Sequence, residues 1–438
     1  MSPRRSLFLV YCCVVAGAPL VVVGEDRPEA FVGARIIPIE GNEIASGTLV
    51  IERGKIKAVG PADSVGVPDN AARHDVSGKV IFPGLICTHS HVGGFGGADS
   101  SGPIQPEVRI QDSLNVRDSG YRRVAAGGLT LINVMPGSGH LISGQTIYLK
   151  MRGGRTIEDL MVRDDDGRPM GGLKMANGTN SMKNPPFPGT RGKSAALVRQ
   201  KFIAAKEYRD KLARAVDDPT KRPPRDLGLE VLIEVLEGRR VVHHHTHRHD
   251  DIITVLRLAR EFNFRVVLHH VSDGWKVADE IAAAGVPCSV ILVDSPGGKL
   301  EAIDHLYETG GILDRAGVKV AFHTDDWITD SRLFLRMPAL AVRAGMSRSA
   351  ALRSVTLAGA EILDLDDRTG SLSVGKDADF VILSGDPLSV YTKVLSTWVE
   401  GKKVFDRGDP ADFLYAVGGY GAGQESTPYL CCIEEGGE

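Results

Sequence analysis

Hydrophobic and polar residues alternate along the first part of the chain, from about residue 30 to residue 80. The alternation comes in short segments such as "VGARIIPIEG" and "SGTLVIERGKIKAVG", which are separated by turns that contain glycine. Gly54 lies within the second segment and marks a hairpin. Because a period of two with glycine at the turns is typical of paired β-strands, we predict a small β-sheet module here.

The same pattern returns near the other end of the chain. The segments "GSLSVGKDADFVILSG" and "VLSTWVEGKKVFD" again alternate apolar and polar residues around glycine turns. A sheet with one apolar face must bury that face against another layer. We therefore expect residues 28–82 and 366–410 to assemble into one composite β-sandwich, with the middle of the chain inserted between its two halves.

The middle of the chain, residues 83–365, alternates apolar segments of strand length with longer segments of helical spacing. Strand-like segments cover residues 84–91, 129–136, 145–151, 171–178, 240–247, 264–270, 286–292 and 317–326, and helical stretches cover 195–215, 250–262, 275–284 and 348–363. Strands that alternate with helices are the signature of a parallel α/β fold. Eight such segments predict a (β/α)8 TIM barrel as the catalytic domain.

Stretches rich in glycine and proline follow three of these predicted strands, at residues 92–106, 136–145 and 176–193. A TIM barrel carries its active-site loops at the ends of its strands. We expect these three stretches to be loops that shape the substrate pocket.

Composition agrees with a large globular protein. Of the 438 residues, 42% are hydrophobic and 24% are charged, which allows a sizeable core. The formal net charge of -3 gives no basic field that would hold nucleic acid. The expected partner is a small-molecule substrate, and a homo-oligomer is compatible with the sequence.

The first 26 residues have the layout of a signal peptide. Two arginines precede an apolar run from Leu7 to Val23, and Glu25 and Asp26 follow it. Cleavage after Ala18 or near Gly24 would give an exported protein, periplasmic or secreted, without stable membrane contact. The alternative is a membrane anchor, because the run approaches the roughly 17 to 25 residues that span a bilayer.

The cysteines do not predict a disulfide framework. Two of the six lie in the leader, Cys87 and Cys288 lie in apolar strand segments, and Cys431 and Cys432 lie in the C-terminal tail, residues 411–438. Four scattered cysteines in a mature chain of this length do not staple a fold. We expect stability to come from the core.

The most specific motif is the pair His89 and His91 in "CTHSH", at the end of a predicted strand. Residues two apart on a strand point to the same face, so both imidazoles can reach one cation. Histidine pairs also occur in hydrogen-bonded cores. The position after an apolar strand and before a glycine-rich loop favours metal binding.

A second histidine cluster is "VVHHHTHRHDD". Alternation places His243, His245 and His247 on one strand face, turns His244 to the other, and leaves His249 to begin a helix. Only the carboxyl end of a strand reaches the active site of a barrel. His245 or His247 is therefore the predicted ligand.

Two further ligands are predicted from the later strands. His269 and His270 are expected to face opposite ways, and the more terminal His270 is the better candidate. Asp325 follows the eighth apolar segment and is predicted to be a metal ligand and general base. The neighbouring Asp326 fits the common role of a helix N-cap.

These motifs together resemble the amidohydrolase superfamily, and more narrowly its imidazolonepropionase-like and prolidase-like branch. The resemblance rests on "PGLICTHSH", "THRHDDI", "LAGAEILDLDDRTGS" and "GSLSVGKDADFVIL", and it covers about residues 30 to 408. It implies one or two divalent metals, usually zinc, bound by His89, His91, His245, His270 and Asp325.

Members of this superfamily with two metals add a carboxylated lysine that bridges the ions. Lys174 in "GLKMANG" occupies the matching position, and its alternative role is that of an ordinary lysine near a loop. The branch usually has a glutamate where Thr179 stands. The absence of that carboxylate argues against a second metal and, less directly, against activity.

The predicted chemistry is hydrolysis by water that the metal activates. Asp325 accepts the proton of that water and passes it to the leaving nitrogen, while His247 and His270 orient the substrate carbonyl. His140 is predicted to line the pocket. The first interpretation is a hydrolase of an amide, cyclic amide or peptide-like C–N bond; the alternatives are an Xaa-Pro-type dipeptidase, a ring deaminase, or a catalytically degenerate metal-binding protein.

Overall fold

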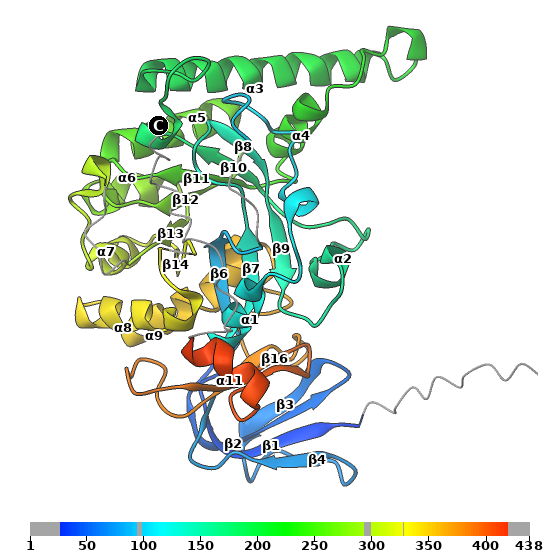
Figure 1. Cartoon of the computed structure of the whole chain (residues 1–438), viewed down its shortest axis with the longest axis vertical. Helices are drawn as coiled ribbons and strands as arrows, with labels where there is room; N and C mark the ends of the chain where they lie inside the picture. Colours follow the sequence, from blue (N-terminus) through cyan, green and yellow to red (C-terminus); the bar gives the residue numbers. More distant parts are fainter. Residues whose placement is uncertain (1–26, 94–98, 293–298, 327, 419–438) are drawn as a thin grey trace, which may run out of the picture.

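The computed structural model describes residues 27–93, 99–292, 299–326 and 328–418. The predicted leader and the tail cysteines lie outside these residues. The described part of the chain forms two regions: a β-sheet built from both chain ends, and a larger α/β region in the middle of the sequence (Figure 1). Within this part, no helix is both long enough and apolar enough to cross a bilayer.

The sheet at the lower end of Figure 1 contains strands from both ends of the chain. Its order is β17-β16-β15-β5-β1-β2-β3, and β4 also pairs with β1. The strands are β1 (Glu29–Ile36), β2 (Ile44–Glu52), β3 (Lys55–Pro61), β4 (Ala72–Asp75), β5 (Val80–Pro83), β15 (Phe380–Leu383), β16 (Val394–Val399) and β17 (Lys402–Asp406). The predicted Gly54 hairpin joins β2 to β3, and Arg53 and Gly54 both have positive φ, as a tight hairpin turn requires.

The two half-sheets join edge to edge through one pair of strands. Strands β5 and β15 pair antiparallel from Val80 to Pro83, so one continuous hydrogen-bonded sheet results. Many of its apolar side chains gather in a cluster in which Phe380 stacks on Trp398 with ring centres 5.5 Å apart. Residues from both chain ends are therefore needed to complete this module.

The larger region contains two further sheets. One has the order β14-β13-β12-β11-β10-β8 and the other the order β6-β7-β9. The strands are β6 (Leu85–Ser90), β7 (Leu129–Val134), β8 (Ile142–Gln145), β9 (Ile147–Lys150), β10 (Leu173–Ala176), β11 (Val242–Thr246), β12 (Val266–His270), β13 (Cys288–Val290) and β14 (Val320–Phe322). Parallel pairing runs from β10 to β14 and joins β6 to β7.

The third predicted strand departs from the expected pattern. Strand β9 runs antiparallel to β7, and β8 runs antiparallel to β10. Residues 135–146, which connect β7 to β9, contain strand β8 and no helix, whereas a parallel crossover usually runs through a helix. The stretch 136–145, predicted to be a loop, therefore includes a strand. The ladders among the described residues form two sheets and not one closed ring.

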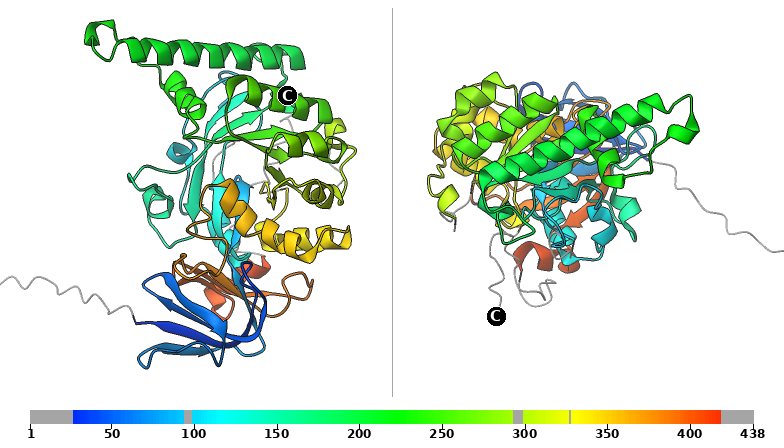
Figure 2. Two further views of the ribbon diagram at one scale, coloured as in Figure 1. Left: turned by 180° about the vertical axis from the view of Figure 1, so that it is seen from behind. Right: turned by 90° about the horizontal axis from the view of Figure 1, so that it is seen from above.

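Helices cover the outside of these sheets, except α11, which packs on α1 and the terminal strand β17 (Figures 1 and 2). They are α1 (Ser119–Ala126), α2 (Ile157–Leu160), α3 (Arg191–Arg214), α4 (Leu227–Leu236), α5 (His249–Phe262), α6 (Ala278–Ala283), α7 (Thr309–Arg315), α8 (Arg336–Arg343), α9 (Arg348–Ser354), α10 (Leu357–Ile362) and α11 (Pro410–Val417). Each of the four predicted helical stretches contains a helix. The long α3 extends past the body of the α/β region (Figure 2).

A buried ion-pair network links the α/β region to the terminal sheet. Lys150, at the end of β9, has 1% of its side chain exposed, and its ammonium group lies 3.0 Å from Asp379 and 3.1 Å from Glu400. It also pairs with Asp377. These carboxylates raise the pKa of Lys150 against the opposing effect of burial. The network ties the predicted barrel insertion to the strands that follow it.

Candidate metal centre

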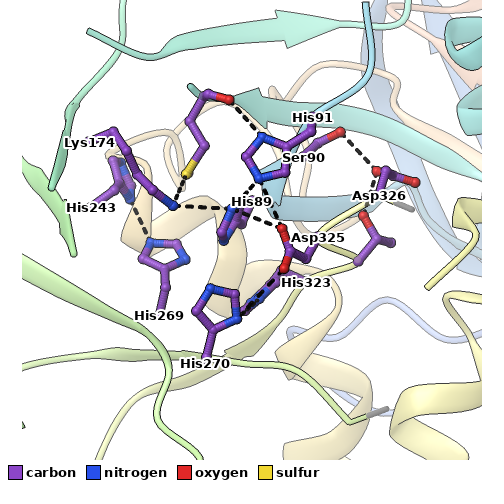
Figure 3. Close-up of polar contacts among 12 residues, drawn as sticks. His89, Ser90, His91, Lys174, His243, His269, His270, His323, Asp325 and Asp326 are labelled. Carbon is purple, nitrogen blue, oxygen red and sulfur yellow. Dashed lines mark hydrogen bonds and ion pairs between the residues drawn. The ribbon is translucent and has the colours of Figure 1, made fainter. Parts of the chain in front are cut away.

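The His89 and His91 pair converges with Asp325 at the end of β6 (Figure 3). The two Nε2 atoms are 3.1 Å apart, and Asp325 Oδ1 lies 3.2 Å from that of His89 and 3.0 Å from that of His91. The Nδ1 of His91 lies 2.8 Å from the carbonyl oxygen of Met135, which fixes the orientation of the ring. The structure thus brings together three of the predicted ligands, all of them buried.

Asp325 is held in an unusual backbone conformation. Its φ is +48°, in the left-handed region of backbone conformation that residues other than glycine rarely adopt. Its amide donates to the carbonyl oxygen of His89 at 3.1 Å, so the loop after β14 is fixed against the end of β6. Strained residues of this kind concentrate at functional sites, where the surrounding structure holds them in place.

Burial alone would raise the pKa of Asp325, but the hydrogen bond with His91 and nearby positive charge lower it to about 2. The carboxylate is therefore ionised at neutral pH. An ionised, buried carboxylate beside imidazole nitrogens can bind a cation or accept a proton.

Asp326 is not the helix cap that its sequence position suggested. Its Oδ2 accepts hydrogen bonds from Ser90 at 2.8 Å and Thr324 at 2.6 Å, and its Oδ1 accepts one from Ser331. The 3-10 helix that follows is capped by Asp330 instead. Asp326 thus fixes the position of the Asp325 loop relative to the His89 strand.

A second group of side chains comes from β11 and β12. One ring nitrogen each of His245, His247 and His270 lies within 4.8 Å of the other two. The Nδ1 of His247 contacts the Ser272 hydroxyl at 2.8 Å, which orients that ring. Because His245 and His247 both belong to this group, the structure does not separate the two alternatives that the sequence left open.

His270 reaches the site through a left-handed backbone conformation, with a φ of +71°. This turn overrides the alternation that predicted opposite directions for His269 and His270. The ring of His269 also lies inside, 5.1 Å from the ring of His89, and its Nε2 is 2.9 Å from Nδ1 of His243 (Figure 3). Both rings therefore lie in the interior, whereas the expectation was that they face opposite ways; of the two, only His270 belongs to a candidate metal group, as predicted.

His323 is a site residue that the sequence interpretation missed. Its Nε2 lies 3.2 Å from Nδ1 of His270, its ring stacks on that of His89, and its Nδ1 contacts the Ser289 hydroxyl at 2.7 Å. His89, His270 and His323 form a third group that could hold an ion. Its position two residues before Asp325, at the end of the same strand segment, was the available signal.

Lys174 also reaches the centre, from β10. Its Nζ lies 3.2 Å from Nε2 of His89 and 3.2 Å from the sulfur of Met135. At Thr179, where the sequence departs from the family pattern, the backbone amide donates to the carboxylate of Glu301 at 2.9 Å. A carboxylate from a distant segment therefore lies against this turn, although the side chain of Thr179 itself is exposed.

The remaining histidines have other positions. His244 contacts the carbonyl oxygen of His245 and belongs to none of the candidate groups, as expected for a side chain on the opposite strand face. His249 begins α5, as predicted. His140, predicted to line the pocket, is buried with its ring 5.2 Å from that of Phe187.

Burial favours the neutral form of His89, His245 and His270. It lowers the pKa of His89, His245 and His270 well below the usual value, and the positive charge of Lys174 lowers each of them further. Burial likewise lowers the pKa of His323, to about 3. Neutral imidazole is the form that binds metal ions.

The unpaired nitrogens of this cluster fit a divalent cation. Neither ring nitrogen of His245 has a hydrogen-bond partner, and Nε2 of both His247 and His270 also lacks one. Buried polar atoms without partners are costly, and they are rare in folded proteins. Several imidazoles with one carboxylate form the donor set that zinc and similar ions prefer.

Comparison with known proteins places this site in a family. A model of the amidohydrolase family matches residues 235–405. The crystal structure of an amidohydrolase from Thermotoga maritima is 32% identical, has a TM-score of 0.80, and matches over 86% of this chain and 100% of that one.

Two curated relatives are more distant. The amidohydrolase tasK of Hapsidospora irregularis is 28% identical over 82% of this chain, which spans only 40% of that protein. An imidazolonepropionase from Fusobacterium nucleatum is 22% identical, over 83% of this chain and 92% of that protein. On the match to the Thermotoga structure, and in agreement with the sequence motifs, the chain belongs to the amidohydrolase family.

Proposed function

We propose that this amidohydrolase cleaves the C–N bond of an amide, a cyclic amide or a peptide-like substrate with one or two divalent metal ions, zinc being the first candidate. The observation that carries the proposal is the contact of the Asp325 carboxylate with His89 and His91, at 3.2 Å and 3.0 Å. A buried carboxylate among imidazole nitrogens supplies both a cation site and a base.

The residues proposed to hold the metal are His89, His91, His245, His270 and Asp325, with His323 as a further donor. When bound there, a divalent cation lowers the pKa of a water molecule from 15.7 toward about 7 and polarises a substrate carbonyl. Lys174, beside His89, is proposed as a residue that would help to hold a second ion once its amine has reacted with carbon dioxide to form a carbamate.

Asp325 is proposed to be the general base. Because its pKa is held at about 2, the carboxylate is free of a proton at neutral pH and can accept one from the attacking water. The same oxygen can then return the proton to the leaving nitrogen. The hydrogen bond from the Asp325 amide to the carbonyl oxygen of His89 holds the carboxylate beside His89 and His91, where the water and the leaving nitrogen are proposed to lie.

His247 and His270 are proposed to orient the substrate carbonyl. When the hydroxyl of Ser272 donates to Nδ1 of His247, the proton of that neutral ring lies on Nε2, which has no other partner. An imidazole Nε2–H can donate to a carbonyl oxygen as negative charge develops on it. His140 is proposed to contact the remainder of the substrate.

The same site supports three related reactions. Attack of activated water on an sp2 carbon serves a cyclic amidase, an Xaa-Pro-type dipeptidase and a ring deaminase, and the surrounding loops select among them. The imidazolonepropionase relatives favour a cyclic amide as the first substrate class to test. A degenerate metal-binding protein is the alternative without turnover, and the intact set of candidate ligands argues against it.

The closed barrel, the β-sandwich and the cellular location of the protein are also proposals. The two sheets of the α/β region are proposed to be parts of one (β/α)8 barrel, and the terminal sheet to fold over as the family's small β-sandwich. Residues 1–26 are proposed to direct export to the periplasm or the exterior, with membrane anchoring as the alternative.

The proposed function is tested with a substrate panel. The purified protein, supplied with zinc, is assayed on N-acyl amino acids, dipeptides, and imidazolone and hydantoin rings, with release of amine or carboxylate as the readout. Hydrolysis of at least one class that the His89→Ala variant does not catalyse supports the proposal. A well-folded, metal-loaded protein that hydrolyses no member of the panel would favour the degenerate alternative.

A further inference from the structure

The long helix α3 carries an excess of positive charge that the rest of the chain does not share. Residues 191–225, which comprise α3 and the segment that leads to α4, contain eleven lysines and arginines and four acidic residues, a formal charge of +7. The whole chain has a formal charge of -3, so the remaining residues together carry -10. Positive charge is therefore concentrated on one element, which Figure 2 shows extending past the α/β region.

The first half of α3 is fixed to the body of the protein. The ring of Phe202 is fully buried and stacks on that of Phe264, with ring centres 5.1 Å apart. Arg199, one turn earlier, pairs with Glu261 of α5 at 2.8 Å. This half of the helix is the base from which the other half projects.

The second half of α3 is joined to the start of α4. The hydroxyl of Tyr208 donates to the carbonyl oxygen of Pro224 at 3.2 Å and accepts a hydrogen bond from the amide of Asp226 at 3.2 Å. Residues 209–225 lie beyond this contact, and we call them the basic tip. The tip is therefore a closed turn with a defined position at the end of the helix.

Three cations of the basic tip are available to an outside partner. Lys211, Arg214 and Arg222 are exposed, and within the described ranges none of them forms an ion pair. With a rise of about 1.5 Å per residue, Arg214 lies about 18 Å along the helix from Phe202, which exceeds the screening length of about 8 Å at physiological ionic strength. The other three cations of the tip have acidic partners, at 4.0 Å, 2.9 Å and 2.6 Å: Arg209 with Asp210, Lys221 with Asp218, and Arg225 with Glu230.

Exposed apolar side chains accompany these cations. Val216, within the tip, is 76% exposed, and Leu227, just beyond it, is 59% exposed. Cations beside exposed apolar side chains are typical of segments that lie on an anionic bilayer, where the apolar groups enter the headgroup region. Sites for single-stranded nucleic acid instead use aromatic side chains on which bases stack, and residues 209–225 contain no aromatic residue.

We propose that the basic tip binds reversibly to the surface of an anionic lipid bilayer, with Lys211, Arg214 and Arg222 against the lipid phosphates and Val216 inserted between the headgroups. A flat surface needs no matching shape, so a projecting tip can reach it, whereas a stable protein interface buries about 800 Å² on each partner. The rest of the chain, at -10, is repelled by the same surface. The tip is thereby the point of contact, and this contact is independent of the proposed hydrolysis and of the leader.

Vesicle binding tests the proposal directly. Purified wild-type protein is sedimented with vesicles of phosphatidylcholine, or of an equimolar mixture of phosphatidylcholine and phosphatidylglycerol. We expect the anionic vesicles to bind the protein roughly 10-fold to 100-fold more tightly, as two or three cations near such a surface provide. This preference should disappear between about 0.1 M and about 1 M salt, because the screening length falls from about 10 Å to about 3 Å.

Two triple variants with the same change in net charge localise the effect. Lys211→Gln, Arg214→Gln and Arg222→Gln combined, the tip variant, should remove most of the preference for anionic vesicles. The control variant replaces three exposed cations of the terminal sheet with glutamine and should retain the preference: Arg73→Gln, Lys79→Gln and Lys402→Gln. Because each variant is compared with the wild type, the result holds whether or not the leader is retained.

A single substitution tests the apolar part of the contact. Val216→Ser should weaken binding to anionic vesicles by roughly 3-fold to 10-fold, because a partly inserted apolar side chain is lost. Thermal melting of every variant checks that it is folded, and all of them should hydrolyse the panel substrates as the wild type does.

Four results would overturn the proposal. The first two are equal binding of anionic vesicles by the wild type and the tip variant, and an equal loss in the control variant. The third is tighter binding of a DNA duplex than of anionic vesicles at the same salt concentration. The fourth is light scattering that shows self-association lost in the tip variant, together with no vesicle binding, which would assign the tip to a contact between copies of the chain.

Discussion

Replacing Asp325 with asparagine distinguishes a role as general base from a role as metal ligand. The Asp325 side chain is buried, with 3% of the residue exposed, and its pKa of about 2 keeps it ionised at neutral pH. Asparagine has nearly the same shape and its carbonyl oxygen can still reach a metal, but it cannot accept a proton at neutral pH. The Asp325→Asn variant should therefore fold, retain most of its metal and lose turnover.

The size of the loss follows from the role assigned to the carboxylate. A positioned general base contributes about 10² to 10⁴-fold to the rate, which corresponds to roughly 2.7 to 5.5 kcal/mol of activation free energy. We expect kcat on the best panel substrate to fall within this range, while metal content falls less than about twofold. Steady-state kinetics and elemental analysis of the same preparation measure both quantities.

The neighbouring aspartate is the matched control. Asp326 contacts Ser90, Thr324 and Ser331 and not the histidines. In Asp326→Asn one or two of these hydrogen bonds lose their acceptor, so thermal stability should fall by about 1 to 3 kcal/mol, with a smaller loss of rate than in Asp325→Asn. An Asp325→Asn variant that retains more than about a tenth of the wild-type rate would contradict its role as the base.

Four further outcomes are expected. His91→Ala should lose metal by elemental analysis, whereas His244→Ala, outside the candidate groups, should keep it, and equal loss from both would refute the assignment of strand faces. Mass spectrometry of protein from a bacterial host should find a mature chain that begins between residues 19 and 26, and an intact Met1 on soluble cytoplasmic protein would refute export. Lys150→Met should destabilise the protein by about 3 to 5 kcal/mol in chemical unfolding, because it leaves buried carboxylates without their cation. Since the pKa of Glu400 is lowered to about 2 by Arg152 and Lys150 against the effect of burial, the contribution of Glu400 should be complete above its unfolded value near 4.5 and be lost as the pH falls toward 2.

Local rules predicted the parts of the site that lie on regular strands. The period of two brought His89 and His91 to one candidate cation site and excluded His244, and the order of strand ends placed Asp325 beside them. The hairpin at Gly54 and the start of α5 at His249 follow from equally local signals. Such features depend on a few neighbouring residues, which is why one sequence is enough to predict them.

Features that depend on tertiary contacts were missed. His270 leaves the extended conformation at its φ of +71°, so alternation failed there and His269 also faces inward. Asp326 binds hydroxyl groups from Ser90, far away in the sequence, and no local pattern distinguishes that role from a helix cap. The antiparallel direction of β9 depends on its pairing with β7, which the apolar pattern of either strand does not reveal.

Metal removal and restoration test the central claim most directly. The purified enzyme is stripped with a chelator, assayed on the best panel substrate, and then titrated with zinc while bound metal and rate are both recorded. We predict that activity disappears with the metal and returns in proportion to one or two bound ions per chain, and that the His89→Ala variant neither binds zinc tightly nor regains activity. Full activity in the stripped protein, or tight zinc binding that leaves His89→Ala as active as the wild type, would contradict hydrolysis at this centre.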